Sequence, residues 1–282
     1  MRPWLWAVVT LVLFMGNTAR ADDARPPSEA SMLVTGTITL NGDGTVRSYT
    51  LDRASRLSDV VVGVIQHNLP DWKFVPPEGH PDGVTGKMTL RMLSRPIDDK
   101  RDRVSIGSAS FDDDPADKAW HVTYKNRGIP SYPMVALRVR ETGTVYLLLR
   151  IARDGHVQDA FAEQVNLDAY ASTQLMSELR ERFAQSAVKA ARDWTFQVPT
   201  QGKAADYPCW YVRVPVNYLM LPRGELPSTY ESEWHAYIPG PRQSVPWNDY
   251  HPSPDRHSDA MASEALQEEG GSLRLLSSLD GE

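Results

Sequence analysis

Apolar and polar positions alternate strictly near the start of the chain. Val34, Ile38 and Leu40 share one face, and threonines occupy positions between them. A period of two with many β-branched residues predicts a half-buried strand. The Asn-Gly-Asp-Gly stretch at 41–44 tolerates positive φ and predicts a hairpin turn. Residues 46–51 are therefore expected to form the return strand.

A helical period follows this hairpin. Apolar residues recur at helical spacing from Leu57 to Leu69. Pro70 is expected to end the helix, because proline cannot continue the main-chain hydrogen-bond ladder. The chain then passes Trp72 and Phe74, crosses a loop rich in proline and glycine, and reaches a strand expected at 84–93.

The same series of patterns returns in the second half of the chain. A strand is expected at 143–151, with a turn at Asp154 and Gly155 and a return strand after it. A long helix follows and ends at Trp194. Another strand is expected at 210–218. The apolar stripe of this helix consists of Leu175, Leu179, Phe183 and Ala187.

The two series align as an internal repeat. Asp43-Gly44-Thr45-Val46 matches Asp154-Gly155-His156-Val157, and Trp72-Lys73-Phe74 matches Trp194-Thr195-Phe196. In both series the Trp-x-Phe motif lies between a helix and a strand. We therefore predict an α+β protein with two tandem small domains, each a helix packed on a two- to three-stranded antiparallel sheet.

Charge and proline content divide the rest of the chain. The charge runs at 98–103 and 112–114 indicate a solvated linker, in which Val104, Ile106 and Phe111 form at most one short edge strand. The predicted segments are a signal peptide at 1–21, a disordered leader at 22–31, a degenerate first domain at 32–94, an acidic linker at 95–128, a second domain at 129–221, and a proline-, aromatic- and polar-rich tail at 222–282.

The N-terminus has the pattern of a secretory signal peptide. Arg2 precedes an apolar run from Trp4 to Met15, and Ala19-Arg20-Ala21 supplies an A-x-A cleavage site. We expect cleavage after Ala21, a periplasmic product and no membrane span in the mature chain. The alternative is a retained anchor, although the run is shorter than the roughly 20 apolar residues of a spanning helix.

Composition excludes some partners. Cleavage would remove Arg2 and Arg20 from the 30 basic residues and leave all 36 acidic ones, for a net charge of −8. This charge argues against nucleic acid or an anionic lipid surface as a partner. Cys209 is the only cysteine, so no intramolecular disulfide is possible.

The second series resembles the C-terminal domain of TonB, the bacterial energy-transducing protein. The resemblance rests on motifs that occur in the family's order: Tyr132-Pro133, Gly143, Asp154-Gly155, Trp194, Phe196 and the Trp210–Tyr218 strand with its Val-Pro-Val ending. It implies a small helix-on-sheet domain, and in that family the strand matching 210–218 pairs with an extended segment of an outer-membrane receptor. The chain differs in having no long proline-rich spacer.

No residue pattern indicates catalysis. There is no G-x-S-x-G or phosphate-binding loop, and we expect neither an enzyme nor a cofactor. Asp249, His251, Asp255 and His257 lie close together in sequence, but the prolines among them argue against a metal site. Trp72, Phe74, Trp194 and Phe196 are expected in the core rather than at a ligand site.

Binding to another protein is therefore the leading interpretation. The candidate surface is the edge of the 210–218 strand, with Trp210, Val212, Val214, Val216 and Tyr218 as binding residues. The tail after Leu221, or a second copy in a homodimer, is an equally weighted alternative cover for this edge. The other functions considered are a structural envelope protein that uses its domains for assembly, and an enzyme whose site lies in the aromatic C-terminal region.

Overall fold

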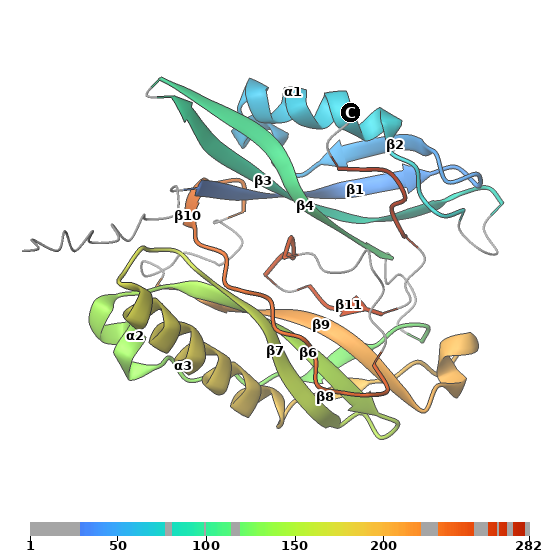
Figure 1. Ribbon diagram of the computed structural model, residues 1–282. Coiled ribbons are helices and arrows are strands. Elements are labelled where there is room, and N and C mark those ends of the chain that lie inside the picture. The colour runs from blue at the N-terminus through green and yellow to red at the C-terminus, as the bar shows by residue number, and fades with distance from the viewer. Residues whose placement is uncertain are drawn as a thin grey trace, which may run out of the picture.

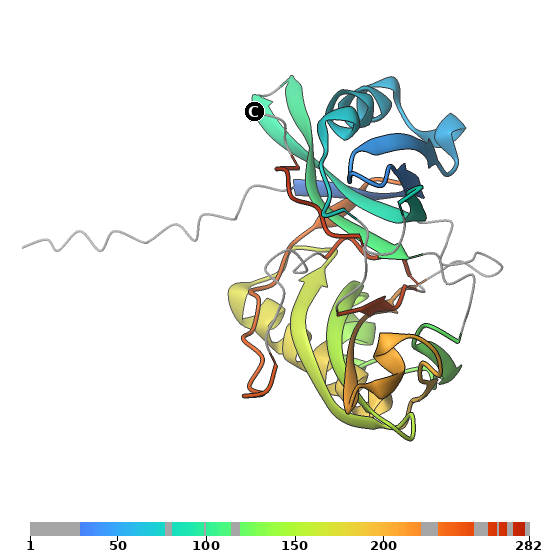
Figure 2. The ribbon, with the colours of Figure 1, turned by 90° about the vertical axis from the view of Figure 1, so that its right-hand side faces the viewer.

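Two antiparallel sheets face each other, with helices on their outer sides and C-terminal segments of the chain between them (Figure 1, Figure 2). The molecule is mixed α/β, and the strand pairs among the described residues are all antiparallel. The computed structural model describes residues 29–76, 81–98, 100–113, 119–220, 231–250, 259–263, 265–269 and 273–279. The predicted signal peptide and residues 22–28 of the leader lie outside this range.

The first sheet has five strands, with β1 (Glu29–Leu40) near its centre. On one side β1 pairs with β3 (Val84–Asp98), which pairs in turn with β4 (Arg101–Asp113). On the other side β1 pairs with β2 (Val46–Leu51) and, through its first residues, with β10 (His235–Tyr237). A strand from the C-terminal region thus completes a sheet built near the N-terminus.

Helix α1 (Asp59–Asn68) covers the outer face of the first sheet (Figure 1). The Ser58 side chain caps its N-terminus by accepting a hydrogen bond from the Val61 amide. Val61 and Ile65 are fully buried against the sheet, as the helical period predicts. Short 3-10 turns flank this helix at η1 (Ala54–Arg56) and η2 (Leu69–Asp71).

The second sheet has four strands. Its central strand, β6 (Gly143–Ala152), lies between β7 (Val157–Leu167) and β9 (Cys209–Tyr218). The short strand β11 (Gln267–Glu268) pairs with the outer side of β9. A separate two-stranded ribbon joins β5 (Thr123–Asn126) to β8 (Thr195–Gln197), and a 3-10 turn, η3 (Lys203–Asp206), precedes β9.

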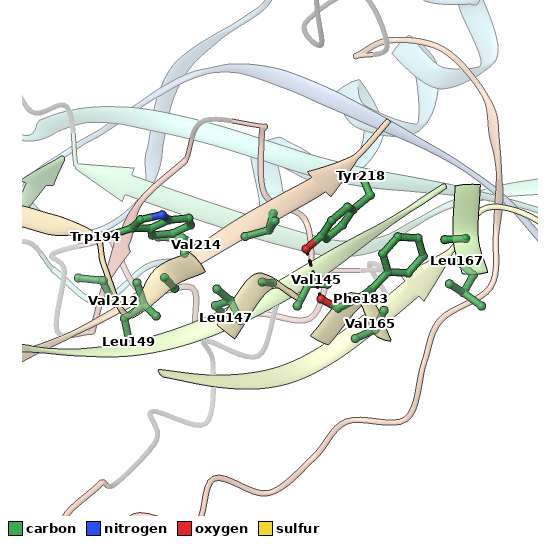
Figure 3. Close-up of a cluster of buried hydrophobic side chains, with 14 of the residues drawn as sticks. Val145, Leu147, Leu149, Val165, Leu167, Phe183, Trp194, Val212, Val214 and Tyr218 are labelled. Carbon is green, nitrogen blue, oxygen red and sulfur yellow. Dashed lines mark hydrogen bonds between the residues drawn. The ribbon is translucent and has the colours of Figure 1, made fainter. Parts of the chain in front are cut away.

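Helix α3 (Thr173–Ala191) covers the outer face of the second sheet. Figure 3 shows Phe183 of this helix beside Tyr218 of β9, and alternate residues of β6 in the same core. The Tyr218 hydroxyl donates a hydrogen bond to the Phe183 carbonyl at 3.3 Å. The Tyr132-Pro133 motif leads directly into a short helix that the sequence patterns did not predict, α2 (Met134–Val139).

The central parts of the two sheets share one order of elements. In each, a central strand pairs with the next strand in sequence and, after a helix, with a third strand. The first two strands carry a register irregularity at Thr39/Leu40 in one sheet and at Arg150/Ile151 in the other. Each irregularity lies just before its Asp-Gly turn, at matching positions of the sequence alignment.

The turn glycines make the same contact in both sheets. Gly44 and Gly155 both have a φ of 83°. The Gly44 carbonyl accepts a hydrogen bond from the Phe74 amide at 2.8 Å, and the Gly155 carbonyl accepts one from the Phe196 amide at 2.8 Å. The Trp-x-Phe motif is therefore attached to the Asp-Gly turn in both cases.

Alanine at either turn glycine is expected to lower the free energy of unfolding by about 2 kcal/mol or more, because a positive φ alone costs roughly 1–2 kcal/mol. The new Cβ would also lie 2.2 Å from the Phe74 carbonyl oxygen in Gly44→Ala, or 2.1 Å from that of Phe196 in Gly155→Ala. Urea unfolding measures the effect. Gly63→Ala is the control, because open space surrounds that position in α1 and a stabilisation of about 0.5–1 kcal/mol is expected. A neutral effect at Gly44 and Gly155 would contradict the tight contact.

Three predictions about the architecture underestimated the amount of strand: the size of the sheets, the linker, and the edge strand within it. The sheets have five and four strands, rather than two or three. The acidic linker at 95–128 contains the end of β3, all of β4, and β5. From the charge run, Asp98 pairs with Arg101 at the end of the long β3–β4 hairpin. The segment with Ile106 and Phe111 is part of a long strand rather than one short edge strand. These two residues are buried in the first core, because apolar and small residues alternate along β4 after its charged start.

The C-terminal tail contributes to both sheets. Within its described residues, β10 and β11 each join a sheet. The segment 273–279 lies against the first core, where Leu275 forms a bridge with Phe74. The tail therefore contacts both sheets, through β10 in the first sheet and β11 in the second.

Candidate functional site

The predicted binding strand is a well-formed element of the second sheet, but its proposed binding side chains face the core. Burial is nearly complete for all five of them: Trp210, Val212, Val214, Val216 and Tyr218. They pack with α3 and with alternate residues of β6. The assignment of these side chains to partner contact is therefore wrong. Strand periodicity places one whole face of β9 inside the core.

The outer main-chain edge of β9 is also partly occupied. The Tyr211 carbonyl accepts a hydrogen bond from the Glu269 amide at 2.9 Å, and the Pro215 carbonyl accepts one from the Arg127 guanidinium at 2.9 Å. Main-chain N–H and C=O groups alternate between the two sides of a strand. In β9, the groups of the odd-numbered residues point away from β6, toward the edge of the sheet. Pro215 itself has no amide to offer. Between Tyr211 and Pro215 the edge is therefore not free: the tail covers it from Tyr211 to Arg213, and Arg127 covers the Pro215 carbonyl.

The β11 segment is held by side chains as well as by its two register pairs with β9. The Glu268 carboxylate accepts a hydrogen bond from the Val122 amide at 2.7 Å. The Glu269 carboxylate contacts the guanidinium of Arg213, a residue of β9 that is only 2% exposed. Arg213 also pairs with Glu163 at 2.6 Å. Opposite charges at close range compensate the cost of burying each ion.

An aromatic cluster adjoins this ion network on the same side of the sheet. Trp247 stacks on Tyr211 with ring centroids 6.1 Å apart, and Tyr250 donates a hydrogen bond to Glu269 at 2.9 Å. Asp249, considered above as a metal ligand, instead pairs with Arg150 at 2.7 Å. The other three residues of that sequence cluster lie outside the described range. Among the described residues, no group of three or more potential metal ligands comes together.

The remaining motif residues have structural partners. The Tyr132 hydroxyl donates a hydrogen bond to the Glu141 carbonyl at 2.5 Å, and its ring packs edge-on against Tyr218. The Asp154 carboxylate accepts a hydrogen bond from the His156 amide at 3.0 Å, which fixes the turn. Trp72, Phe74, Trp194 and Phe196 are all buried. These contacts are structural: they fix a turn, a helix start and the two cores.

A buried polar cluster joins the two sheets, and the sequence analysis did not identify it. Arg91 of β3 donates hydrogen bonds to Ser31 at 2.8 Å and to the Tyr146 hydroxyl of β6 at 2.9 Å. Its Nε lies 3.3 Å from a carboxylate oxygen of Asp259, which also accepts a hydrogen bond from Asn166. The available signal was Arg91 itself, a charged residue inside the mostly apolar run 88–93 of β3.

The Asp259 carboxylate is held in its charged form by this cluster. Burial alone would raise its pKa, but the Arg91 charge and hydrogen bonds from Tyr237, Ser108 and Asn166 outweigh burial and lower it. Arg91 and Asp259 are each more than nine-tenths buried. The contact between the sheets is thus ionic as well as apolar, and both ions are compensated within the protein.

The described helices include none that is long and apolar enough to cross a membrane. Comparison with known proteins found no matching family model, no matching curated protein and no matching solved structure.

Proposed function

We propose that the chain is a non-enzymatic periplasmic protein that binds other proteins through two TonB-C-like domains in tandem. The observation that carries this proposal is the repeated order of strand, Asp-Gly turn, strand, helix, Trp-x-Phe and strand. The matching hydrogen bonds from Phe74 to Gly44 and from Phe196 to Gly155 support a common origin for the two units. The sequence resemblance lies in the same elements.

The partner surface that fits this proposal is the β9 edge with β11 displaced. β9 spans ten residues, whereas β11 pairs with it at only two positions. An incoming extended segment could form more main-chain hydrogen bonds than β11 does, although Pro215 limits a continuous ladder. We propose that a segment of an outer-membrane receptor or another envelope protein exchanges with β11, which links the chain to TonB-dependent transport.

The second candidate is a structural envelope protein whose domains serve assembly or dimerisation. One observation favours it: the chain's own strands pair with the third strand of each repeated unit, on the side where a partner strand would add. β4 pairs with the outer side of β3, and β11 pairs with β9. In this alternative both edges are closed permanently, and other surfaces mediate assembly.

A disulfide that locks β11 onto β9 distinguishes these candidates. Val212 and Glu268 are opposite each other in the register, so cysteines at both positions lie within bridging range. Cys209→Ser removes the native thiol. In pulldowns from envelope extract, the reduced Val212→Cys/Glu268→Cys protein is expected to capture partners about tenfold more strongly than the oxidised protein, because only the reduced form can release β11.

Each single-cysteine variant, treated with the same oxidant, serves as the control and should bind equally in both redox states. Melting curves must show that the oxidised and reduced double variants are both folded. Equal capture of the same partners by both forms would contradict strand exchange at β9. Capture of no partner by either folded form would favour the structural alternative.

A further inference from the structure

A cavity of about 180 Å³ lies beside β4, at the border between the two sheets. Its described wall comes from β4 of the first sheet, from β11 of the second sheet and from the tail segment 273–279. Figure 1 shows this tail segment, in red, running beside the end of β4. Neither sheet therefore forms the cavity alone, and the tail supplies the rest of its wall.

Two buried polar side chains in this wall have no hydrogen-bond partner among the described residues. They are Ser110 of β4, through its hydroxyl, and Gln267 of β11, through Oε1. Ser110 is only 3% exposed and Gln267 only 4%. A buried polar group without a partner costs free energy, and in folded proteins most such groups have a partner in the protein or in bound solvent. Two of them at one cavity point to a molecule that binds there.

Strand geometry directs both side chains into the space between the sheets. Ser108 precedes Ser110 by two residues on β4 and donates a hydrogen bond at 2.7 Å to Asp259, part of the cluster that joins the sheets. Side chains two apart on a strand share a face, so Ser110 points the same way. Gln267 is opposite Arg213 in the register and shares its face, which is the face of β9 turned away from α3.

The rest of the wall is largely apolar. Its apolar members are Ala109, Phe111, Leu273, Leu275 and Leu279. The Ser277 hydroxyl also belongs to the wall, but it accepts a hydrogen bond from the Lys73 amide at 3.1 Å. The cavity has room for several waters, each of which needs about two to four polar partners. A mostly apolar molecule therefore fills this space better than water does.

The charge of the wall favours an uncharged molecule. None of its described residues is acidic, and its one basic residue, Arg274, is exposed to solvent. The Ser110 hydroxyl can donate or accept a hydrogen bond, and Gln267 Oε1 accepts one. A single hydroxyl group on a ligand satisfies both at once, because it donates one hydrogen bond and accepts another. Apolar protein cavities of about 150 Å³ bind one benzene ring, so the volume here suits a ring-sized molecule.

We propose that the cavity beside β4 binds a small uncharged molecule with a ring-sized apolar body and one hydroxyl group. The hydroxyl donates to Gln267 Oε1 and accepts from Ser110, and the apolar body packs against Phe111 and the leucines of the tail. Because Gln267 belongs to β11, the site is complete only while β11 is paired with β9. The proposal does not depend on the exchange of β11 with a partner segment.

Fluorine NMR on the purified full chain tests the proposal with three probes of similar size. At about pH 7, 4-fluorophenol is uncharged and carries the hydroxyl, fluorobenzene lacks it, and 4-fluorobenzoate has a negative charge instead. 4-Fluorophenol is expected to bind about five- to tenfold more tightly than fluorobenzene, because its hydroxyl satisfies two buried groups that are otherwise unpaired. The benzoate is expected to bind more weakly than either.

The matched variants are Ser110→Ala and Gln267→Met, which remove the two polar groups and keep the apolar wall. Each is expected to weaken 4-fluorophenol binding about fivefold and to leave fluorobenzene binding close to that of the parent. The controls are Ser105→Ala on the same strand and Gln174→Met on the exposed face of α3, both outside the cavity wall. Both controls should keep the parent's preference for 4-fluorophenol.

The melting temperatures of the free proteins provide a second readout. Neither polar group has a partner among the described residues, so Ser110→Ala and Gln267→Met are expected to leave the Tm within about 1 °C of the parent or to raise it. A fall of more than about 2 °C in both variants would mean that bound water already satisfies these groups, and it would contradict the proposal.

A cavity that holds water only is the alternative that these measurements separate from a ligand site. It predicts no binding of 4-fluorophenol, or equal binding of 4-fluorophenol and fluorobenzene, and either result would overturn the proposal. Tighter binding of the benzoate, or an unchanged preference in both Ser110→Ala and Gln267→Met, would also overturn it. Loss of the preference in these two variants and in neither control would establish the site. No partner protein is present, so the result is independent of capture at the β9 edge.

Discussion

Replacing Trp194 by alanine is expected to lower the free energy of unfolding of the second sheet and its helix by about 3–5 kcal/mol. The side chain is fully buried where α3 ends and the chain re-enters the sheet. Its Nε1 donates a hydrogen bond to the Gly128 carbonyl at 2.8 Å, and Arg127 lies over its ring. Truncation therefore leaves a large cavity and an unsatisfied carbonyl. Urea unfolding followed by far-UV circular dichroism measures the loss.

The repeat supplies a matched comparison for this prediction. Trp72 occupies the corresponding position in the first sheet and is also buried, but none of the residues that the structure describes accepts a hydrogen bond from its Nε1. Trp194→Phe should therefore cost about 1 kcal/mol more than Trp72→Phe, which removes a donor that was unsatisfied. Trp120→Ala is the exposed control and should change stability little, since its side chain is about half exposed. A small effect of Trp194→Ala would show that the core does not depend on this corner.

The elements with a clear period were predictable from the sequence. β1, α1 and α3 follow periods of two or 3.6, and each buries the face that its pattern indicates, whereas β6 is a continuous apolar run that is buried on both faces. The Asp-Gly turns were recognisable for a related reason, because a glycine with positive φ is required at one position of each.

The elements that were missed depend on contacts distant in sequence. β10 and β11 have only three and two residues, and they are strands because β1 and β9 offer them unpaired main-chain groups. In β4, the charges of the hairpin tip obscured the alternation that follows them. Periodicity within a short window cannot indicate which edge a tail segment will join.

The candidate site shows the same division. The sequence pattern indicated β9 correctly as a strand after the Trp-x-Phe motif, but it could not show that the tail returns to its edge. The binding residues chosen there were the apolar ones, and these are the residues that a sheet buries. The cavity beside β4 brings together Ser110, Gln267 and Leu275 from distant parts of the chain. No spacing in the sequence relates these three residues.

Replacing Arg91 by methionine is expected to destabilise the protein by about 3–5 kcal/mol, because it leaves the Asp259 carboxylate buried without its counter-ion. Arg91 is only 6% exposed, and it joins β1, β6 and the 259–263 segment. Arg95→Met is the control on the same strand. Its ion pair with Glu29 has an N–O distance of 2.8 Å, but the Arg95 side chain is 54% exposed, so at most about 1 kcal/mol should be lost.

The pairing itself is measured by a double-mutant cycle with Asp259→Asn, which removes the charge and keeps one oxygen acceptor, either for Ser108 at the Oδ1 position or for Tyr237 at the Oδ2 position. The two single changes should be non-additive by about 1–3 kcal/mol, since each removes the same interaction. The sign of the pH dependence provides an independent check. The pKa of Asp259 is lowered in the folded protein, so its contribution is present above about pH 4, the value in unfolded chains, and is lost as pH falls through the folded pKa. The parent should therefore lose stability in acid more steeply than Asp259→Asn does. Additive single effects together with identical acid profiles would mean that packing alone joins the two sheets.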